Sequence, residues 1–157
     1  MTSPQQSVAT VAAGLLALTG AAVHGLGFVA CDLALAKLVR GLGFLSPLLL
    51  AAPTGMGLLM VALLEAVSAA GLFIGAVILW CRRRGGIWVT LVASVPGLLA
   101  GLLLVTHVVP APLVFGKQMA GLPTGAVAWA IFLYSLVATI VVVALSISLP
   151  KQQPYRA

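Results

Sequence analysis

The stretch Gly55–Trp80, GMGLLMVALLEAVSAAGLFIGAVILW, decides what kind of protein this chain forms. Its 26 residues carry one charge, at Glu65, and Arg82-Arg83-Arg84 follow almost at once. Because a helix rises about 1.5 Å per residue, roughly 20 apolar residues are enough to cross the hydrocarbon core of a bilayer. The stretch therefore predicts a transmembrane helix that is long enough to span with some tilt.

The composition of the whole chain agrees with a membrane protein. Hydrophobic residues make up 62%, charged residues 6%, and the mean hydropathy is +1.24, whereas about a quarter of the residues of a soluble domain are charged. The net charge of +6 comes from basic residues scattered over predicted loops and helix ends. We interpret them as topology signals and contacts to anionic lipid head groups, not as a nucleic-acid interface.

Three further apolar runs complete the predicted fold class, an all-α integral membrane protein with four transmembrane helices in a single bundle over residues 1–157. The expected spans are 8–30, 55–80, 87–109 and 125–149. The apolar run 42–52 in the first outer loop, interrupted by Pro47, is too short to span, and we expect an interfacial or re-entrant segment there. We expect the first span to be retained and not cleaved as a signal peptide, because no Lys or Arg precedes it.

The distribution of basic residues predicts an orientation. Dense positive charge in a short loop is retained on the cytoplasmic side, so Arg82, Arg83 and Arg84 are the expected topology determinants. With both termini also inside, five basic residues lie in the cytoplasm and three outside, the latter being Lys37, Arg40 and Lys117. The Gly- and Ala-rich helices favour a bacterial plasma membrane.

Four titratable residues lie in or next to the predicted spans, and all four project to the outer half of the membrane. They are His24, Asp32, Glu65 and His107. From the expected helix ends, His24 lies about 9 Å and Glu65 about 15 Å below the outer surface, whereas His107 lies near the rim. We take this group as the candidate binding or proton-relay residues.

Helical spacing predicts which way these side chains face. At intervals of three and four residues, small side chains accompany each of them, for example Ala17 and Gly20 with His24, and Ser68 with Glu65. Small residues let helix backbones approach closely. We therefore expect His24, Glu65 and His107 to point into the bundle.

Glu65 is the costliest of these residues to place in a membrane. A carboxylate at mid-membrane costs a few kcal/mol or more, so Glu65 is expected to be protonated or paired, with His24 its nearest candidate by depth. One interpretation is a neutral acid that hydrogen-bonds between helices. The other is a proton-relay, ion-binding or substrate-binding role.

Two cofactor hypotheses also follow from the histidines. His24 and His107 on different helices form a candidate pair of axial ligands for a b-type haem. Together with Glu65 they have ligand types that suit zinc or copper, but no short-range ligand motif supports such a site. We therefore expect neither a cofactor nor a metal, and keep haem as the less favoured alternative.

No catalytic motif points to an enzyme. The chain lacks a Walker loop, a Gly-x-Ser-x-Gly elbow and a Cys-x-x-Cys pair, and its short loops offer no catalytic residues. The leading hypothesis is a small non-enzymatic multi-pass protein, an accessory or structural subunit packed beside other integral membrane proteins. The alternatives are a proton- or ion-coupled transport element centred on Glu65 and a bis-histidine haem anchor formed by His24 and His107.

Overall fold

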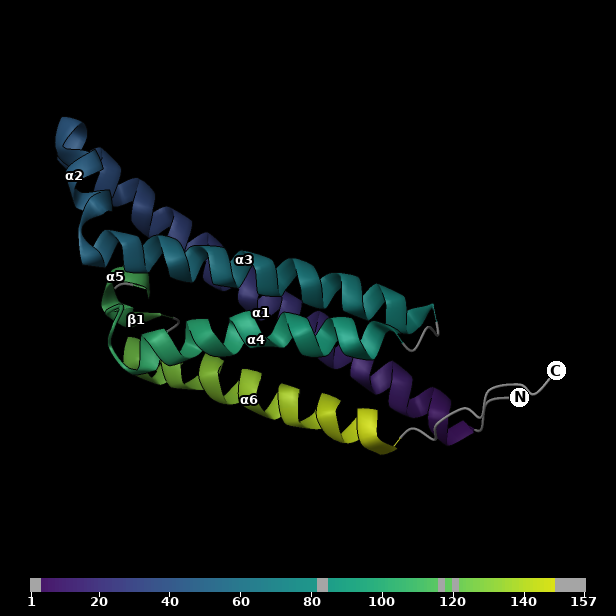
Figure 1. The fold of residues 1–157 in the computed structure, drawn as a ribbon. Helices are drawn as coiled ribbons and strands as arrows, with labels where there is room; N and C mark the ends of the chain where they lie inside the picture. The colour runs from purple at the N-terminus through teal and green to yellow at the C-terminus, as the bar shows by residue number, and fades with distance from the viewer. Residues whose placement is uncertain (1–3, 82–84, 116–117, 120–121, 149–157) are drawn as a thin grey trace.

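The computed structural model describes residues 4–81, 85–115, 118–119 and 122–148, and four long helices account for most of them (Figure 1). The bounds of these helices are α1 Pro4–Leu42, α3 Pro53–Trp80, α4 Gly85–Val105 and α6 Thr124–Ser148. All four are long and apolar enough to cross a membrane. The predicted all-α, multi-pass bundle is confirmed, while the predicted topology determinants Arg82–Arg84 lie outside the described residues.

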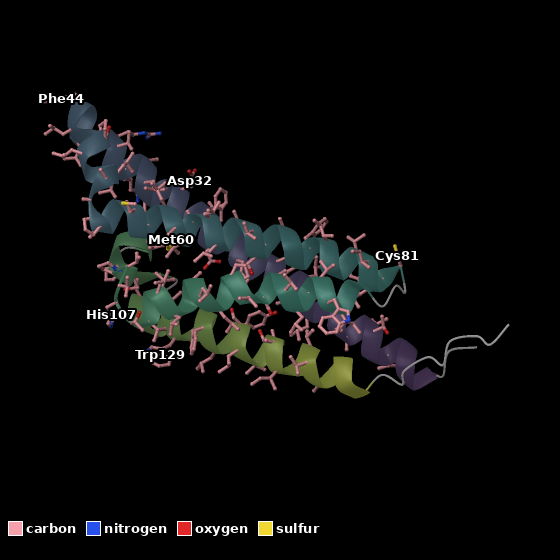
Figure 2. All side chains as sticks on the ribbon, viewed as in Figure 1. Asp32, Phe44, Met60, Cys81, His107 and Trp129 are labelled. Carbon is pink, nitrogen blue, oxygen red and sulfur yellow. The ribbon has the colours of Figure 1, made fainter. Side chains whose placement is uncertain are left out.

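The helices pack in the order in which they occur along the chain. α3 lies along α1, α4 along α3, and α6 along α4, whereas α1 crosses the bundle and also meets α6 (Figure 1). The start of α1 and the end of α6 lie at the same end as Cys81, which Figure 2 labels. We call this end the Cys81 end, and we call the opposite end, where the longer connections lie, the α5 end.

Short elements connect the helices at the α5 end. Between α1 and α3 the chain forms a 3-10 turn and a short helix, and between α4 and α6 a short helix and a two-residue antiparallel ladder. Their bounds are η1 Gly43–Leu45, α2 Ser46–Ala51, α5 Ala111–Phe115, β1 Gln118–Met119 and β2 Leu122–Pro123. α3 then begins at Pro53, where Ala52 is extended, as expected for a residue before proline.

The first helix is longer than the sequence predicted. It does not end at Ala30 but continues to Leu42, because residues 30–40 contain Ala, Leu, Lys and Arg, which favour helix, and neither Gly nor Pro. Its 39 residues correspond to about 58 Å, nearly twice the hydrocarbon thickness. The connection between α1 and α3 is therefore shorter than predicted and comprises residues 43–52.

Close backbone approach joins α3 to α4. A Cβ added to Gly71 would lie 2.6 Å from the Ala93 Cβ, and one added to Gly75 would collide with the Thr90 side chain. Ser68 of α3 also donates a hydrogen bond of 2.7 Å to the Ala93 carbonyl of α4. The two helices are thereby held in a fixed register near Pro96, which lies inside α4.

Candidate functional site

A buried pair of ionisable side chains lies in the interior of the bundle. His24 of α1 and Glu65 of α3 contact each other through Nδ1 and Oε2 at 2.6 Å. Their side chains are 2% and 1% exposed. Because α1 and α3 are adjacent and both turn their small-residue faces inward, the two polar groups meet each other and not lipid.

The pair lies close to the middle of the helices, slightly nearer to the α5 end. Glu65 follows the first residue of α3 by twelve positions and precedes the last by fifteen. Two exposed tryptophans lie on either side of this level, Trp88 about 14 Å away along α4 and Trp129 about 9 Å away along α6. Tryptophans mark membrane interfaces, so the pair lies inside the span and nearer to its α5 end. The α5 end is the predicted outer end, so the outer-half estimate for His24 and Glu65 stays a prediction.

Ser135 of α6 is the third member of the site. Its Oγ lies 3.2 Å from His24 Nε2, and it donates its own hydrogen to the Ile131 carbonyl at 2.9 Å. When the Ser135 hydrogen lies on the Ile131 carbonyl, the Ser135 oxygen accepts a hydrogen bond from His24, in the tautomer whose Nε2 carries a proton. One further proton then lies between Nδ1 and Glu65 Oε2.

This proton arrangement makes the pair neutral as a whole. It consists either of an imidazolium beside a carboxylate or of a neutral imidazole beside a carboxylic acid. The two forms differ only in whether the shared proton is bonded to Nδ1 or to Oε2. An isolated charge at the centre of a bilayer costs about 3 kcal/mol or more, whereas a neutral pair with a short, charge-assisted hydrogen bond avoids most of that cost. The site can therefore move a proton between its two members without adding a net charge to the bundle.

The second oxygen of Glu65 has no such partner. Oε1 is buried and makes no hydrogen bond to any part of the chain that the structure describes. It lies against Gly27 of α1, where an added Cβ would be 3.1 Å from Oε1 and 2.9 Å from the carboxyl carbon. A buried acceptor without a partner is rare in folded proteins and requires an explanation.

The opposite side of the His24 ring is formed by α4. A Cβ added to Gly97 would lie 2.5 Å from both Cε1 and Nε2 of His24, and 2.7 Å from the Ser68 Oγ. The backbone of Gly27 thus packs against Glu65, and the backbone of Gly97 packs against His24. The bundle has room for the imidazole and the carboxyl only because neither position has a side chain.

A small cavity adjoins the site. Its volume is about 20 Å³, enough for one water molecule. Polar side chains from three helices are among its lining residues, namely His24, Ser94, Tyr134 and Ser135. The surface that these residues turn toward the cavity is nevertheless almost wholly apolar.

The structure does not bring the other two predicted site residues to this place. Asp32 is exposed on α1, eight residues and about 12 Å beyond His24. His107 lies beyond the end of α4 in an exposed turn, with a positive φ of 59°, and Figure 2 shows it at the α5 end of the bundle. The expectation that His107 points into the bundle was wrong, because the helix ends at Val105 before reaching it.

These positions also bear on the cofactor hypotheses. His24 contacts α4 at Gly97, and His107 lies ten residues further along, about 15 Å if measured as helix. His107 therefore lies at a different level of the bundle from His24, and both nitrogens of His24 are already bonded to Glu65 and Ser135. Within the described ranges, no three His, Cys, Asp or Glu side chains gather as metal ligands would.

Sequence reasoning missed Ser135, Tyr134 and the glycines that flank the pair. Ser135 and Tyr134 are polar residues inside an apolar span, which is a signal that side chains there face protein. Gly97 belongs to a small-residue face that the sequence predicts to point into the bundle, but neither Gly97 nor Gly27 indicated a contact with His24 or Glu65, because the neighbours of a glycine in a membrane helix depend on packing.

Comparisons with known proteins add no functional assignment. No protein family, curated protein or solved structure matches this chain.

Proposed function

We propose that this integral membrane protein is a proton-coupled transport element in which Glu65 and His24 bind and release the proton. The observation that carries the proposal is the buried Nδ1–Oε2 contact of 2.6 Å midway along the helices, next to a carboxyl oxygen that has no partner in the described part of the chain. Ionisable residues inside a membrane are expensive and usually mark proton or ion pathways.

A purely structural role explains this geometry less well. A neutral glutamic acid that only ties two helices together gains from having both oxygens hydrogen-bonded, because a buried acceptor without a partner costs about 1–3 kcal/mol. Among the residues that the structure describes, Glu65 instead has no hydrogen-bond partner for Oε1. A free oxygen on a titratable carboxyl is the expected arrangement for a group that must accept or release a proton.

The small size of the cavity between the helices limits which species the protein can transport. The cavity beside His24 has room for about one water molecule, and glycine backbone closes on both sides of the pair. A proton can pass along the hydrogen bonds that join Ser135, His24 and Glu65. An organic substrate needs a larger opening between the helices. We therefore propose the proton itself as the species that this site handles.

Proton flux in liposomes tests the proposal. The full chain is reconstituted with a pH-sensitive dye inside the vesicles, and an imposed pH difference is followed with time. We expect Glu65→Gln to abolish the protein-dependent flux, because the amide keeps the shape of the side chain but cannot exchange a proton. Asp32→Asn is the matched control, since it makes the same chemical change on an exposed carboxyl. Unchanged flux in Glu65→Gln would refute the proposed function.

We further propose that both termini and Arg82–Arg84 face the cytoplasm of a bacterial plasma membrane. The support is the excess of basic residues that the sequence assigns to the cytoplasmic side, five against three. Cys81 is exposed and Cys31 is buried, so a thiol reagent reports mainly on Cys81. We expect a membrane-impermeant maleimide to label Cys81 in inverted vesicles and not in intact cells, with Cys81→Ser as the control for specificity. Labelling in intact cells alone would mean the opposite orientation.

A further inference from the structure

We infer that Ser135 is a positioning residue for His24, which keeps Nε2 hydrogen-bonded both when this nitrogen carries a proton and when it does not. The inference rests on the proposed function, because it concerns the change of protonation that proton transport requires. It gives Ser135 two roles toward the same ring nitrogen, acceptor in one protonation state and donor in the other.

The hydroxyl of Ser135 has two acceptors within hydrogen-bonding distance. Its Oγ lies 2.9 Å from the Ile131 carbonyl oxygen, one turn earlier in α6, and 3.2 Å from His24 Nε2 of α1. A hydroxyl has two lone pairs and one hydrogen, which rotates about the Cβ–Oγ bond. With the hydrogen on Ile131, Oγ accepts a hydrogen bond from a protonated Nε2. With the hydrogen turned toward α1, Oγ donates to a bare Nε2, and no heavy atom has to move.

The rotation leaves the Ile131 carbonyl paired. Ile131 lies within α6, so its carbonyl also accepts the backbone N–H of the residue four positions later, which is Ser135 itself. The side-chain bond to this carbonyl is an addition that a helix does not need. His24 is different, because its side chain is 2% exposed and a buried polar atom without a partner is costly. The hydroxyl can therefore leave Ile131 easily, whereas His24 needs it in both states.

The contact with Glu65 decides which nitrogen changes its protonation. Nδ1 and Oε2 are 2.6 Å apart, and both are acceptors when neither carries a proton, so this short contact requires a proton between them. When the pair loses one of its two protons, the other stays in this contact and Nε2 becomes bare. The N–H bond at Nε2 breaks, its electron pair stays on nitrogen, and the proton goes to water that reaches the ring when the helices open. Ser135 then turns its hydrogen to Nε2.

The other polar groups around the ring have different partners. Within the described residues, Ser135 is the one hydroxyl that is hydrogen-bonded to His24. The ionisable group that contacts the ring is Glu65 of α3, and α4 approaches it with the backbone of Gly97. The nearby hydroxyls that instead donate to backbone carbonyls, at 2.7, 2.7 and 2.9 Å, are those of Ser68, Ser94 and Tyr134. The hydrogen bonding of Nε2 therefore depends on Ser135.

Nitrogen NMR of the histidine rings tests this inference. The chain has two histidines, so labelling with ¹⁵N-histidine gives two ring spin systems, and exposed His107 serves as the internal reference. Spectra of the full chain in micelles are recorded from about pH 4 to about pH 10. We expect His24 in the wild type to lose its proton from Nε2 and not from Nδ1. A Nε2 whose protonation does not change over this range would overturn the inference.

Ser135→Ala separates the two roles of the hydroxyl. Loss of an acceptor moves the resonance of a protonated ring nitrogen upfield, and loss of a donor moves that of a bare ring nitrogen downfield. We therefore expect Ser135→Ala to shift the Nε2 resonance upfield at the acidic end and downfield at the basic end. Thr139→Ala is the matched control and should leave Nε2 unshifted, because Thr139 makes the same kind of bond to a carbonyl four residues earlier in α6.

Two further variants keep the test decisive. Ser135→Thr retains a hydroxyl that can bond the carbonyl one turn earlier, and it should restore both wild-type shifts. If Ser135→Ala does not fold, as judged by circular dichroism, Ser135→Cys replaces it, because a thiol is a weaker donor and acceptor and the shifts keep their signs. An unshifted Nε2 at either end would overturn the inference, whatever the flux. Opposite shifts together with a flux that ignores Glu65→Gln would keep the role of Ser135 and refute the transport proposal.

Discussion

The hydrogen bond between His24 and Glu65 requires that two residues packed against it, Gly27 and Gly97, have no side chain. Gly27 and Gly97 leave room for the carboxyl and the imidazole, and Ser135 then orients the ring through Nε2. Each of these contacts is made by a different stretch of the chain. The site is therefore sensitive to single added methyl groups as well as to the loss of its polar members.

We expect Gly97→Ala to destabilise the protein by about 1–3 kcal/mol, the usual effect of overpacking a filled core. The new Cβ would lie 2.5 Å from two atoms of the His24 ring, so the ring must move away from Ser135 or Glu65. Equilibrium unfolding in mixed detergent micelles measures the change. Gly25→Ala is the control, because a Cβ at Gly25 meets nothing within 4 Å. Equal stability of the two variants would contradict the packing described here.

At the level of single elements, the length of α1 is the main difference from the prediction. A span of 8–30 was expected, and the helix runs from Pro4 to Leu42. The charged residues near its end do not stop it, because Lys and Arg are good helix formers and a helix may continue into water. The break comes only at Gly43, whose φ is +53°, a conformation that favours glycine.

Two glycines at this end of α1 should respond in opposite ways to alanine. Neither position has atoms within 4 Å of an added Cβ, so only the backbone decides. Gly41 is helical, and we expect Gly41→Ala to stabilise by about 0.5–1 kcal/mol. Gly43 has a positive φ, and we expect Gly43→Ala to destabilise by about 1 kcal/mol. Unfolding of the two variants side by side provides the measurement, and a change of the same sign in both would argue against the turn at Gly43.

On the scale of the whole molecule, the four helices form one bundle with a polar centre and apolar surroundings. α1 and α6 each keep much of their surface outside the bundle, as expected for helices that face lipid or other membrane helices. Such surfaces do not by themselves distinguish lipid from protein neighbours. The hypothesis of an accessory subunit therefore stays a prediction.

Purification in mild detergent tests that hypothesis. As an accessory subunit the chain is expected to copurify with a larger membrane protein in constant stoichiometry, which size-exclusion chromatography and mass spectrometry detect. A self-sufficient proton carrier is expected to contain only this chain, as one or more copies. A preparation that contains this chain alone and conducts protons would contradict the accessory role, whereas an inactive chain with a stoichiometric partner would support it.

The sequence by itself determined the class of the protein, the number of its membrane-spanning helices and the need for Glu65 to be neutralised. These features follow from local chemistry, because a bilayer admits few charges and requires backbone groups to be bonded within each helix. Only the tertiary structure decided that Ser135 contacts His24, that Gly27 and Gly97 flank the pair, and that His107 lies apart from it. Those relations depend on the rotation and axial shift of each helix, which are set by packing against its neighbours and not by its own hydropathy.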